Sequence, residues 1–306
     1  MKNPLKNAFI FPGQGAQRPG MGKDFYDSFL TAKEVFQQAD DTLSIGLSKI
    51  IFNGPMDKLT ETMYSQPAIF VTSIAILHTI KKQFPDLLPS FTGGLSLGEY
   101  SALVAAEKLD FISALKLVAA RGQYMQEACE RFPGTMLVVM GLGEDEIAKS
   151  GAYIANLNCP GQIVVACPNE KVDSITENMN ERGAKRVLPL AVSGAFHSPL
   201  MATAKEKLTP LIEDMNFQKS RILLAMNVLG DFVSDVTEIK KYLIDQVASP
   251  TRWMDCVLAI SKEEPSFFFE MGPSQLSSMN RKIGVTAPTI SIDQVFDLER
   301  IHEATR

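Results

Sequence analysis

Gly94-Leu95-Ser96-Leu97-Gly98 is the stretch of sequence that decides the fold. It has the form G-x-S-x-G and stands between a predicted strand that ends at Gly94 and a predicted helix over residues 99–107. In that setting the two glycines permit a sharp turn that exposes the serine hydroxyl at the end of a sheet, a nucleophile elbow. A glycine-rich turn with an incidental serine would give the same five letters. The strand before it and the helix after it favour the elbow.

Outward from this turn, short apolar runs alternate with stretches of helical spacing. Residues 8–11 and 91–94 have the character of buried strands, and residues 24–40, 66–83 and 110–130 have that of helices. The alternation predicts an α/β fold, with a parallel sheet and crossover helices.

The pattern changes between about residues 131 and 192. The predicted order there is strand, helix, two strands, helix and strand, which is the order of ferredoxin-like domains. We therefore expect a small inserted domain over 131–192. A large domain made of residues 1–130 and 193–306 surrounds it in the sequence.

The 306-residue chain has a net charge of −5 and is 45% hydrophobic. This balance argues against a general nucleic-acid binder, which would carry a basic face. The four cysteines form no CxxC pair and there are three histidines, so neither a zinc site nor a disulfide framework is indicated. No run of 18 apolar residues and no signal or transit peptide pattern occurs. We therefore expect no membrane span and a cytoplasmic location.

A serine hydroxyl is a poor nucleophile without a base, and the histidines are the candidates for that base. His302 lies in the polar tail, where we expect it to be solvated, and His78 lies inside a helical segment, where a packed or surface role is expected. His197 lies in a loop after a predicted strand, where catalytic groups are common. A lone loop histidine is usually inert, but because the chain has so few histidines, His197 is the best candidate for a partner to Ser96.

The loop Gly13-Gln14-Gly15 follows the first predicted strand. It does not fit a dinucleotide-binding motif or a P-loop, and it suits either a phosphate cradle or a second oxyanion donor. Arg121 lies on the apolar face of the helix over 110–130. A guanidinium buried there needs an anionic partner. The helix alone favours an internal salt bridge or a snorkelling stem, and a substrate carboxylate is the alternative.

These pieces, in this order, resemble the malonyl-CoA:acyl carrier protein transacylases and the related acyltransferase domains of polyketide synthases. The resemblance extends from about residue 7 to 285. The motifs that carry it are Phe11–Gln17, Ser65–Ala68, Gly94–Leu103, Arg121-Gly122 with Met125–Ala128, Asn156–Val164, Gly194–Ser198, Gln246 with Ser249–Trp253, and Glu270–Pro273. Their shared order along the chain makes the resemblance far more specific than the serine pentapeptide.

The resemblance implies an α/β-hydrolase-like large domain with a ferredoxin-like insert and an active site in the cleft between them. It implies that Ser96 is the acylated nucleophile and His197 its base. The other implied roles are an oxyanion hole from the N–H groups of Gln14 and Leu97, a histidine-orienting carbonyl on Gln246, a malonyl-binding cation on Arg121, and polar positions in the cleft at Gln66 and Asn158.

The chain departs from the family at two places. Leu95 stands where many members have histidine, which removes a polar group beside the nucleophile. Ser274-Gln275-Leu276 stands where glycine and lysine are common. Phe196 resembles members that select malonyl over methylmalonyl units, because a phenyl ring beside His197 crowds a branched α-carbon.

The expected function is transfer of a malonyl group from coenzyme A to the phosphopantetheine thiol of acyl carrier protein, through a malonyl-serine ester, in fatty acid biosynthesis. The expected enzyme is a monomer that uses no metal or cofactor. Its partners are malonyl-CoA and the carrier protein, and neither nucleic acid nor membrane. The alternatives are a trans-acting polyketide synthase acyltransferase, an acyl-thioester hydrolase on the same scaffold, and a non-catalytic carrier-protein docking module. Lys185, Arg186 and Arg281 are candidates for contact with an acidic carrier protein, and a solvated surface is the alternative for each.

Overall fold

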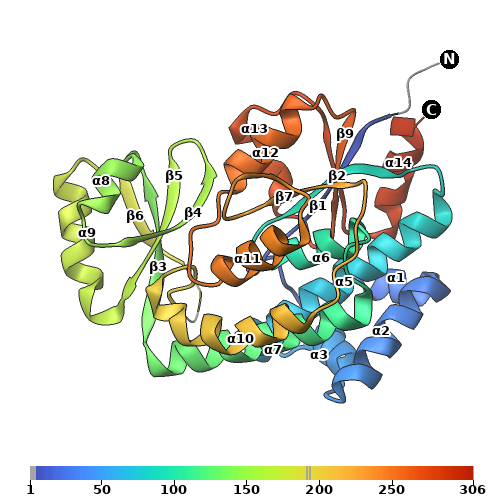
Figure 1. Ribbon diagram of the computed structural model, residues 1–306, viewed down its shortest axis with the longest axis horizontal. Helices are drawn as coiled ribbons and strands as arrows, with labels where there is room; N and C mark the ends of the chain where they lie inside the picture. Colours follow the sequence, from blue (N-terminus) through green and yellow to red (C-terminus); the bar gives the residue numbers. More distant parts are fainter. Residues whose placement is uncertain (1–4, 191, 193, 306) are drawn as a thin grey trace.

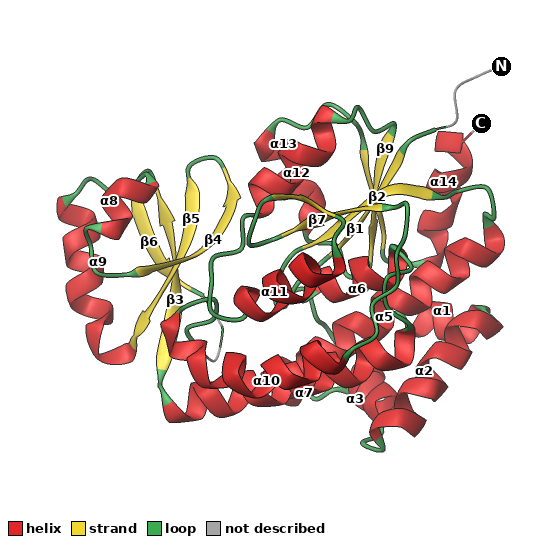
Figure 2. Ribbon diagram, in the orientation of Figure 1, coloured by secondary structure: helices red, strands yellow, loops and turns green. Residues whose placement is uncertain are grey.

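The computed structural model describes residues 5–190, 192 and 194–305 and contains two sheets that lie side by side (Figure 1). In spatial order, the strands of the larger sheet are β10 (Thr289–Ile292), β9 (Phe267–Met271), β1 (Asn7–Phe11), β2 (Pro89–Gly94), β7 (Leu223–Met226) and β8 (Asp231–Val233). The first five run parallel, and β8 pairs antiparallel with β7 at the edge. Helices cover the sheet (Figure 2), as the alternating sequence pattern predicts.

The strand β1 shows why this sheet lies between two layers. Phe9 and Phe11 belong to one hydrophobic core, and Ala8 and Ile10 to the other. Successive side chains of a strand point to opposite faces, so a wholly apolar strand is one with both faces covered. β1 pairs with β2 in a register that places Phe11 opposite Gly94. The loops that follow these two strands therefore start at the same edge of the sheet.

The helix α5 (Thr62–Gln83) packs against α2 (Leu30–Leu43) and α7 (Phe111–Arg131) in the larger core. Among the described residues it is the one helix that is long and apolar enough to cross a membrane. However, 83% of its apolar window is buried inside the protein. Its composition is therefore that of a core helix, apolar on all sides because it is covered on all sides.

The smaller sheet has the strand order β4 (Tyr153–Cys159), β5 (Gln162–Pro168), β3 (Gly134–Met140) and β6 (Arg186–Pro189), with antiparallel neighbours. The helices α8 (Glu144–Ala148) and α9 (Val172–Glu181) pack over a separate hydrophobic core. The chain order of strands and helices is the ferredoxin-like order that the sequence predicts. We propose that residues 131–192 form a domain inserted into the larger unit.

Backbone hydrogen bonds join the two units beside the site described below. The Leu157 N–H donates to the Thr251 carbonyl (2.9 Å), and the Thr251 N–H donates to the Ala155 carbonyl (2.8 Å). The Asn156 side chain donates to the Thr251 hydroxyl. The strand β4 is thus tied to the segment before α12 (Trp253–Lys262).

Several short elements were not predicted from the sequence. They are α3 (Leu47–Asn53), α4 (Met56–Thr60), α13 (Leu276–Ile283), α14 (Leu298–Thr305), β8 and β10. The predicted helix over 24–40 is two helices, α1 (Lys23–Ser28) and α2, because the backbone of Phe29 is extended (φ −131°, ψ 126°). The helices that position the site are α6 (Gly98–Ala105), α7, α10 (Ala202–Asp214) and α11 (Val236–Gln246).

Candidate active site

Ser96 occupies a sharp turn between β2 and α6. Its backbone is left-handed, with φ +53°, which is uncommon for a residue that carries a side chain. Both flanking glycines are required. A Cβ at Gly94 would lie 2.0 Å from the Gly98 carbonyl carbon, and a Cβ at Gly98 would lie 2.2 Å from the Phe11 carbonyl oxygen. The turn therefore has the elbow geometry that the pentapeptide predicts.

Asn227, the residue after β7, holds this turn in place. Its Oδ1 accepts from the Ser96 N–H (2.6 Å), and its Nδ2 donates to the Gly94 carbonyl (2.7 Å). Its own N–H donates to Oε2 of the Glu99 carboxyl group (2.6 Å). Burial raises the pKa of Glu99 to about 8, against the opposing effect of its hydrogen bonds. Asn227 was not predicted, because it lies far from Ser96 in the sequence and no motif marks it.

The His197 ring bridges the serine and a main-chain carbonyl. Its Nε2 lies 2.8 Å from Ser96 Oγ, and its Nδ1 lies 2.8 Å from the carbonyl oxygen of Gln246. A carbonyl oxygen can only accept a hydrogen bond, so Nδ1 carries the proton and Nε2 of the neutral ring is bare. A bare Nε2 can accept the proton of the serine hydroxyl. Ser96 and His197 therefore form a dyad whose histidine is oriented by a carbonyl.

His197 is poised to act as a base at neutral pH. Burial and, to a smaller extent, the positive charge of Arg121 lower the pKa of His197 to about 4, against the opposing effect of backbone hydrogen bonds with Gln246 and Ser249. The imidazole is therefore uncharged at pH 7. The other histidines lie elsewhere: the exposed His302 packs at a tilt against Phe84, and the ring of His78 lies against Phe111.

We expect kcat/KM of a reaction in which His197 removes the Ser96 proton to keep most of its neutral-pH value down to about pH 5. The pH dependence of kcat/KM follows the free enzyme, and a base with a pKa of about 4 is still mostly unprotonated there. An ordinary histidine, with a pKa of about 6.5, would be about 97% protonated. The measurement is a pH–rate profile.

Circular dichroism at each pH is the control for that profile. A histidine whose pKa is lowered on folding contributes stability that decreases as the pH falls below about 6.5. Loss of rate must therefore be separated from loss of fold. A midpoint near 6.5 in a folded enzyme would contradict the role of His197 as the buried base.

Arg121 lies beside Ser96 with a fully buried side chain. One terminal nitrogen donates to Ser96 Oγ (3.1 Å) and to Gln246 Oε1 (3.0 Å), and the other donates to Gln66 Oε1 (2.5 Å). These partners are neutral, and Nε has no hydrogen-bond partner among the described residues. No carboxylate in the described part of the chain forms an ion pair with Arg121, so the internal salt bridge is wrong. Glu99 acts on this charge without forming an ion pair with it, and the cavity beside Arg121 is open to an anionic group of a ligand.

Gln66 and Gln246 stand behind Arg121. We expected Gln66 in the wall of the cleft, but it is fully buried one layer deeper, where it contacts Arg121 and does not line the cavity. Gln246 forms hydrogen bonds with several residues of the site. Besides its bonds to His197 and Arg121, its Nε2 donates to the Ser96 carbonyl (2.9 Å) and to Glu99 (3.1 Å).

Two backbone N–H groups near Ser96 are free to donate. Among the described residues, neither the N–H of Leu97 nor that of Gln14 has a hydrogen-bond acceptor. Leu97 follows the serine at the N-terminal end of α6, where the helix dipole is positive, and Gln14 lines the same cavity as Ser96. Unpaired N–H groups so placed suit a developing oxyanion.

A cavity of about 380 Å³ opens in front of Ser96 and is lined by both units. Its polar side holds Ser96, His197, Arg121 and Asn158, and the Asn158 side-chain oxygen is buried without a partner in the described part of the structure. Its apolar wall consists of Leu95, Met125, Met136, Val138, Val164, Leu190, Val192, Phe196 and Met279. A nucleophile, a base, two oxyanion donors and a cation around one cavity suit acyl transfer from a small substrate with an acidic group.

Comparison with known proteins agrees with this chemistry. Residues 8–294 match the family described as the acyl transferase domain. Over 304 residues the chain is 40% identical to a malonyl CoA-acyl carrier protein transacylase of Bacillus subtilis strain 168, which covers 96% of this chain and 95% of that protein.

Two solved structures have the same fold. An acyl carrier protein S-malonyltransferase from Vibrio cholerae gives a TM-score of 0.89 at 36% identity, over 97% of this chain and 99% of that one. A structure of a type II PKS acyl-carrier protein in complex with its malonyl-transacylase gives a TM-score of 0.92 at 32% identity, again over 97% and 99% of the two chains.

Proposed function

Because this chain belongs to the acyl transferase domain family, among the malonyl-CoA:acyl carrier protein transacylases, we propose how its own residues move a malonyl group from coenzyme A to the carrier protein. One observation carries the proposal. A buried guanidinium without a carboxylate partner in the described residues lies 3.1 Å from the hydroxyl of Ser96, whose neighbouring histidine is neutral at pH 7.

The first half of the reaction acylates Ser96. The hydroxyl oxygen attacks the thioester carbonyl carbon while His197 Nε2 takes the hydroxyl proton. The N–H groups of Gln14 and Leu97 stabilise the oxyanion, an effect of about 3 kcal/mol for one donor in comparable sites. The carbon–sulfur bond then breaks, His197 returns the proton to the sulfur, and coenzyme A leaves as the thiol. Arg121 pairs with the free carboxylate of the malonyl group.

The second half uses the same groups with the carrier-protein thiol as the nucleophile. His197 takes the thiol proton, the sulfur attacks the ester carbonyl, and Ser96 leaves with the proton returned by His197. Coenzyme A and the carrier protein both end in a phosphopantetheine arm, so one cavity serves both halves. We assign the unpartnered oxygen of Asn158 to an amide N–H of that arm.

Two side chains account for the choice of acyl group. An acetyl group would leave the buried charge of Arg121 without an anion, which a site built around that charge rejects. Phe196 lines the cavity beside His197, and its ring restricts the room for a branched α-carbon. Malonyl units are therefore favoured over acetyl and methylmalonyl units.

An acyl-thioester hydrolase on this scaffold would also use Ser96 and His197. We expect malonyl-carrier protein to be the main product. The ion pair with Arg121 holds the malonyl ester in one pose, and the carrier protein binds beside it, whereas water is not held in position to attack the ester. The test supplies labelled malonyl-CoA and holo carrier protein and separates malonyl-carrier protein from free malonate. Apo carrier protein, which lacks the thiol, is the control. Malonate as the faster product would decide for the hydrolase.

This chain carries basic side chains near the cavity that can contact an acidic carrier protein. Lys185 and Lys282 line a small pocket with Gln162, which also lines the catalytic cavity. We propose that this patch, extended by Arg186 and Arg281, receives the acidic carrier protein. A docking module without catalysis would bind there and form no acyl adduct. We propose that the enzyme serves fatty acid synthesis. Competition between the carrier proteins of fatty acid synthesis and of polyketide synthesis for malonyl loading tests this choice of pathway.

We further propose that the enzyme acts as a monomer in the cytoplasm. All groups of the proposed site come from one chain, so the chemistry needs no second copy. All four cysteines are free and buried, as in proteins of reducing compartments. Size-exclusion chromatography with light scattering tests the oligomeric state.

A further inference from the structure

The loop Gly13–Gly15 is held by side chains on both sides of its central peptide group. The Gly13 N–H donates to Gln275 Oε1 (2.9 Å), and the Gly15 N–H donates to Gln17 Oε1 (2.7 Å). Gln275 Nε2 donates to the carbonyl oxygen of Gln14 (3.4 Å). The peptide groups before and after the one that carries the Gln14 N–H are therefore fixed, and that N–H itself is free among the described residues.

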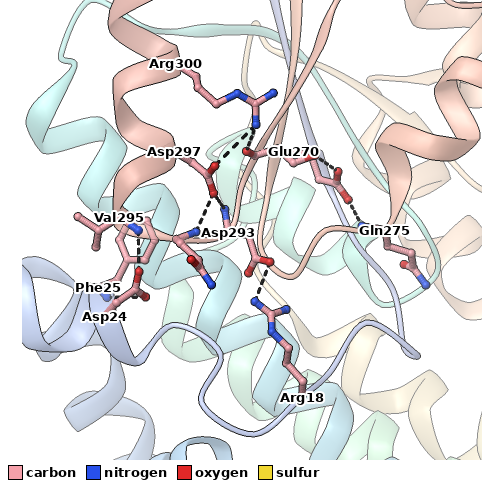
Figure 3. A network of polar contacts seen from close by, with 11 residues as sticks. Arg18, Asp24, Phe25, Glu270, Gln275, Asp293, Val295, Asp297 and Arg300 are labelled. Carbon is pink, nitrogen blue, oxygen red and sulfur yellow. Dashed lines mark hydrogen bonds and ion pairs between the residues drawn. The ribbon is translucent and has the colours of Figure 1, made fainter.

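The backbone of Gln275 is fixed in turn by a buried carboxylate. Glu270, at the end of β9, accepts from the N–H groups of Gln275 (2.6 Å), Leu276 (2.6 Å) and Ser277 (3.2 Å), as Figure 3 shows for Gln275. The Ser291 hydroxyl also donates to it (2.6 Å). A carboxylate with these donors at the start of α13 holds the helix end rigidly. The Gln275 side chain thus reaches the loop from a fixed base.

A further polar contact lies at Arg18, three residues after Gly15. Arg18 donates to the Asp293 carboxylate (2.7 Å), and the following turn is organised by Asp297 (Figure 3). Without Gln275 only one flank of the Gln14 peptide group would remain held, by Gln17.

We propose that Gln275 is a positioning residue, whose amide aims the Gln14 N–H at the oxyanion. This inference rests on the proposed role of Gln14 in the oxyanion hole. A side-chain amide suits the task because it can accept from one peptide N–H and donate to a carbonyl at the same time. Gln275 acts through the backbone of the loop and touches neither the hydroxyl nor the imidazole.

Gln275→Met tests the proposal, since it keeps the length of the side chain and removes both hydrogen bonds. We expect kcat to fall about 10- to 100-fold, less than the about 10²- to 10³-fold loss on deleting an oxyanion donor, with KM for malonyl-CoA nearly unchanged. Gln275→Asn, one methylene too short to span both groups, is expected to behave alike. Gln83→Met, the same change at an exposed residue far from the cavity, is the matched control.

A second assay separates this inference from the choice of substrate. Acetylation of Ser96 by p-nitrophenyl acetate forms an oxyanion with no malonyl group, and its rate should fall in both variants by a factor similar to that in kcat. Wild-type enzyme that reacts with the ester and not with malonyl-CoA would overturn the proposed substrate and leave Gln275 testable. Unchanged rates in folded variants, or a raised KM at unchanged kcat, would overturn the positioning role.

Discussion

Ser96→Ala is expected to lower kcat for malonyl transfer by about 10⁴-fold or more, since removal of the nucleophile from a comparable serine site costs up to about 10⁶-fold. The alanine cannot form the ester, and the remaining catalysis would come only from binding and from the N–H groups of Gln14 and Leu97. Intact-protein mass spectrometry after incubation with malonyl-CoA should show one malonyl adduct on the wild type and none on the variant.

The control for this result is Ser101→Ala, which removes a hydroxyl from a buried position in the same helix, α6. The Ser101→Ala variant should still form the malonyl adduct and should keep most of the transfer rate. Peptide mapping should place the adduct on Ser96. Adduct formation that survives Ser96→Ala would remove the elbow serine from the mechanism.

Arg121→Ala is expected to reverse the preference between malonyl and acetyl groups. The wild type should favour malonyl-CoA strongly, and the variant should lose about 10³-fold in kcat/KM for malonyl-CoA while its rate with acetyl-CoA changes by less than about tenfold. The reason is that the buried charge is a partner for one substrate and an obstacle to the other. Competition between the two thioesters for covalent loading of Ser96 is the measurement.

Part of any loss at Arg121 will be structural, because the substitution leaves Gln66 and Gln246 without their charged donor. Thermal unfolding of the variant measures that part. Arg131→Ala, at the exposed end of the same helix α7, is the matched control and should leave the preference unchanged. Equal losses for the two substrates would remove Arg121 from recognition of the acyl group.

The parts of the fold that the sequence predicted are those with a local signal. The strand β1 is a continuous apolar run in the sequence because both of its faces are covered. The small sheet is recognisable from the order of its strands and helices along the chain. The short edge strands β8 and β10 gave no signal, since three or four residues show no periodicity. The helix α5 begins at Thr62, before the expected start, and continues through Pro67, a residue that inside a helix usually kinks or ends it.

Of the residues at the site, some were predictable from a local sequence signal and others only from the tertiary structure. Ser96 was readable because its glycines are needed where backbones nearly touch, and His197 because few histidines compete for the role. The helix over 110–130 placed Arg121 on a buried face, but only the tertiary structure shows that no carboxylate of the described chain pairs with it. Asn227 and Gln275 act on backbone groups far away in the sequence, and such contacts leave no periodic or motif signature.

The construction of the cavity from two sheets has a consequence for how new specificities arise. The wall formed by Met136, Val138 and Val164 belongs to β3 and β5, whereas the elbow and the carbonyl that orients the base belong to the larger unit. This part of the pocket wall is thus encoded in a different segment from the catalytic groups and from Arg121 and Phe196. A chimera that receives residues 134–189 from a relative would inherit a different pocket wall and would keep the reaction of its host together with Arg121 and Phe196. Recombination at this boundary therefore measures how far the wall alone alters selectivity.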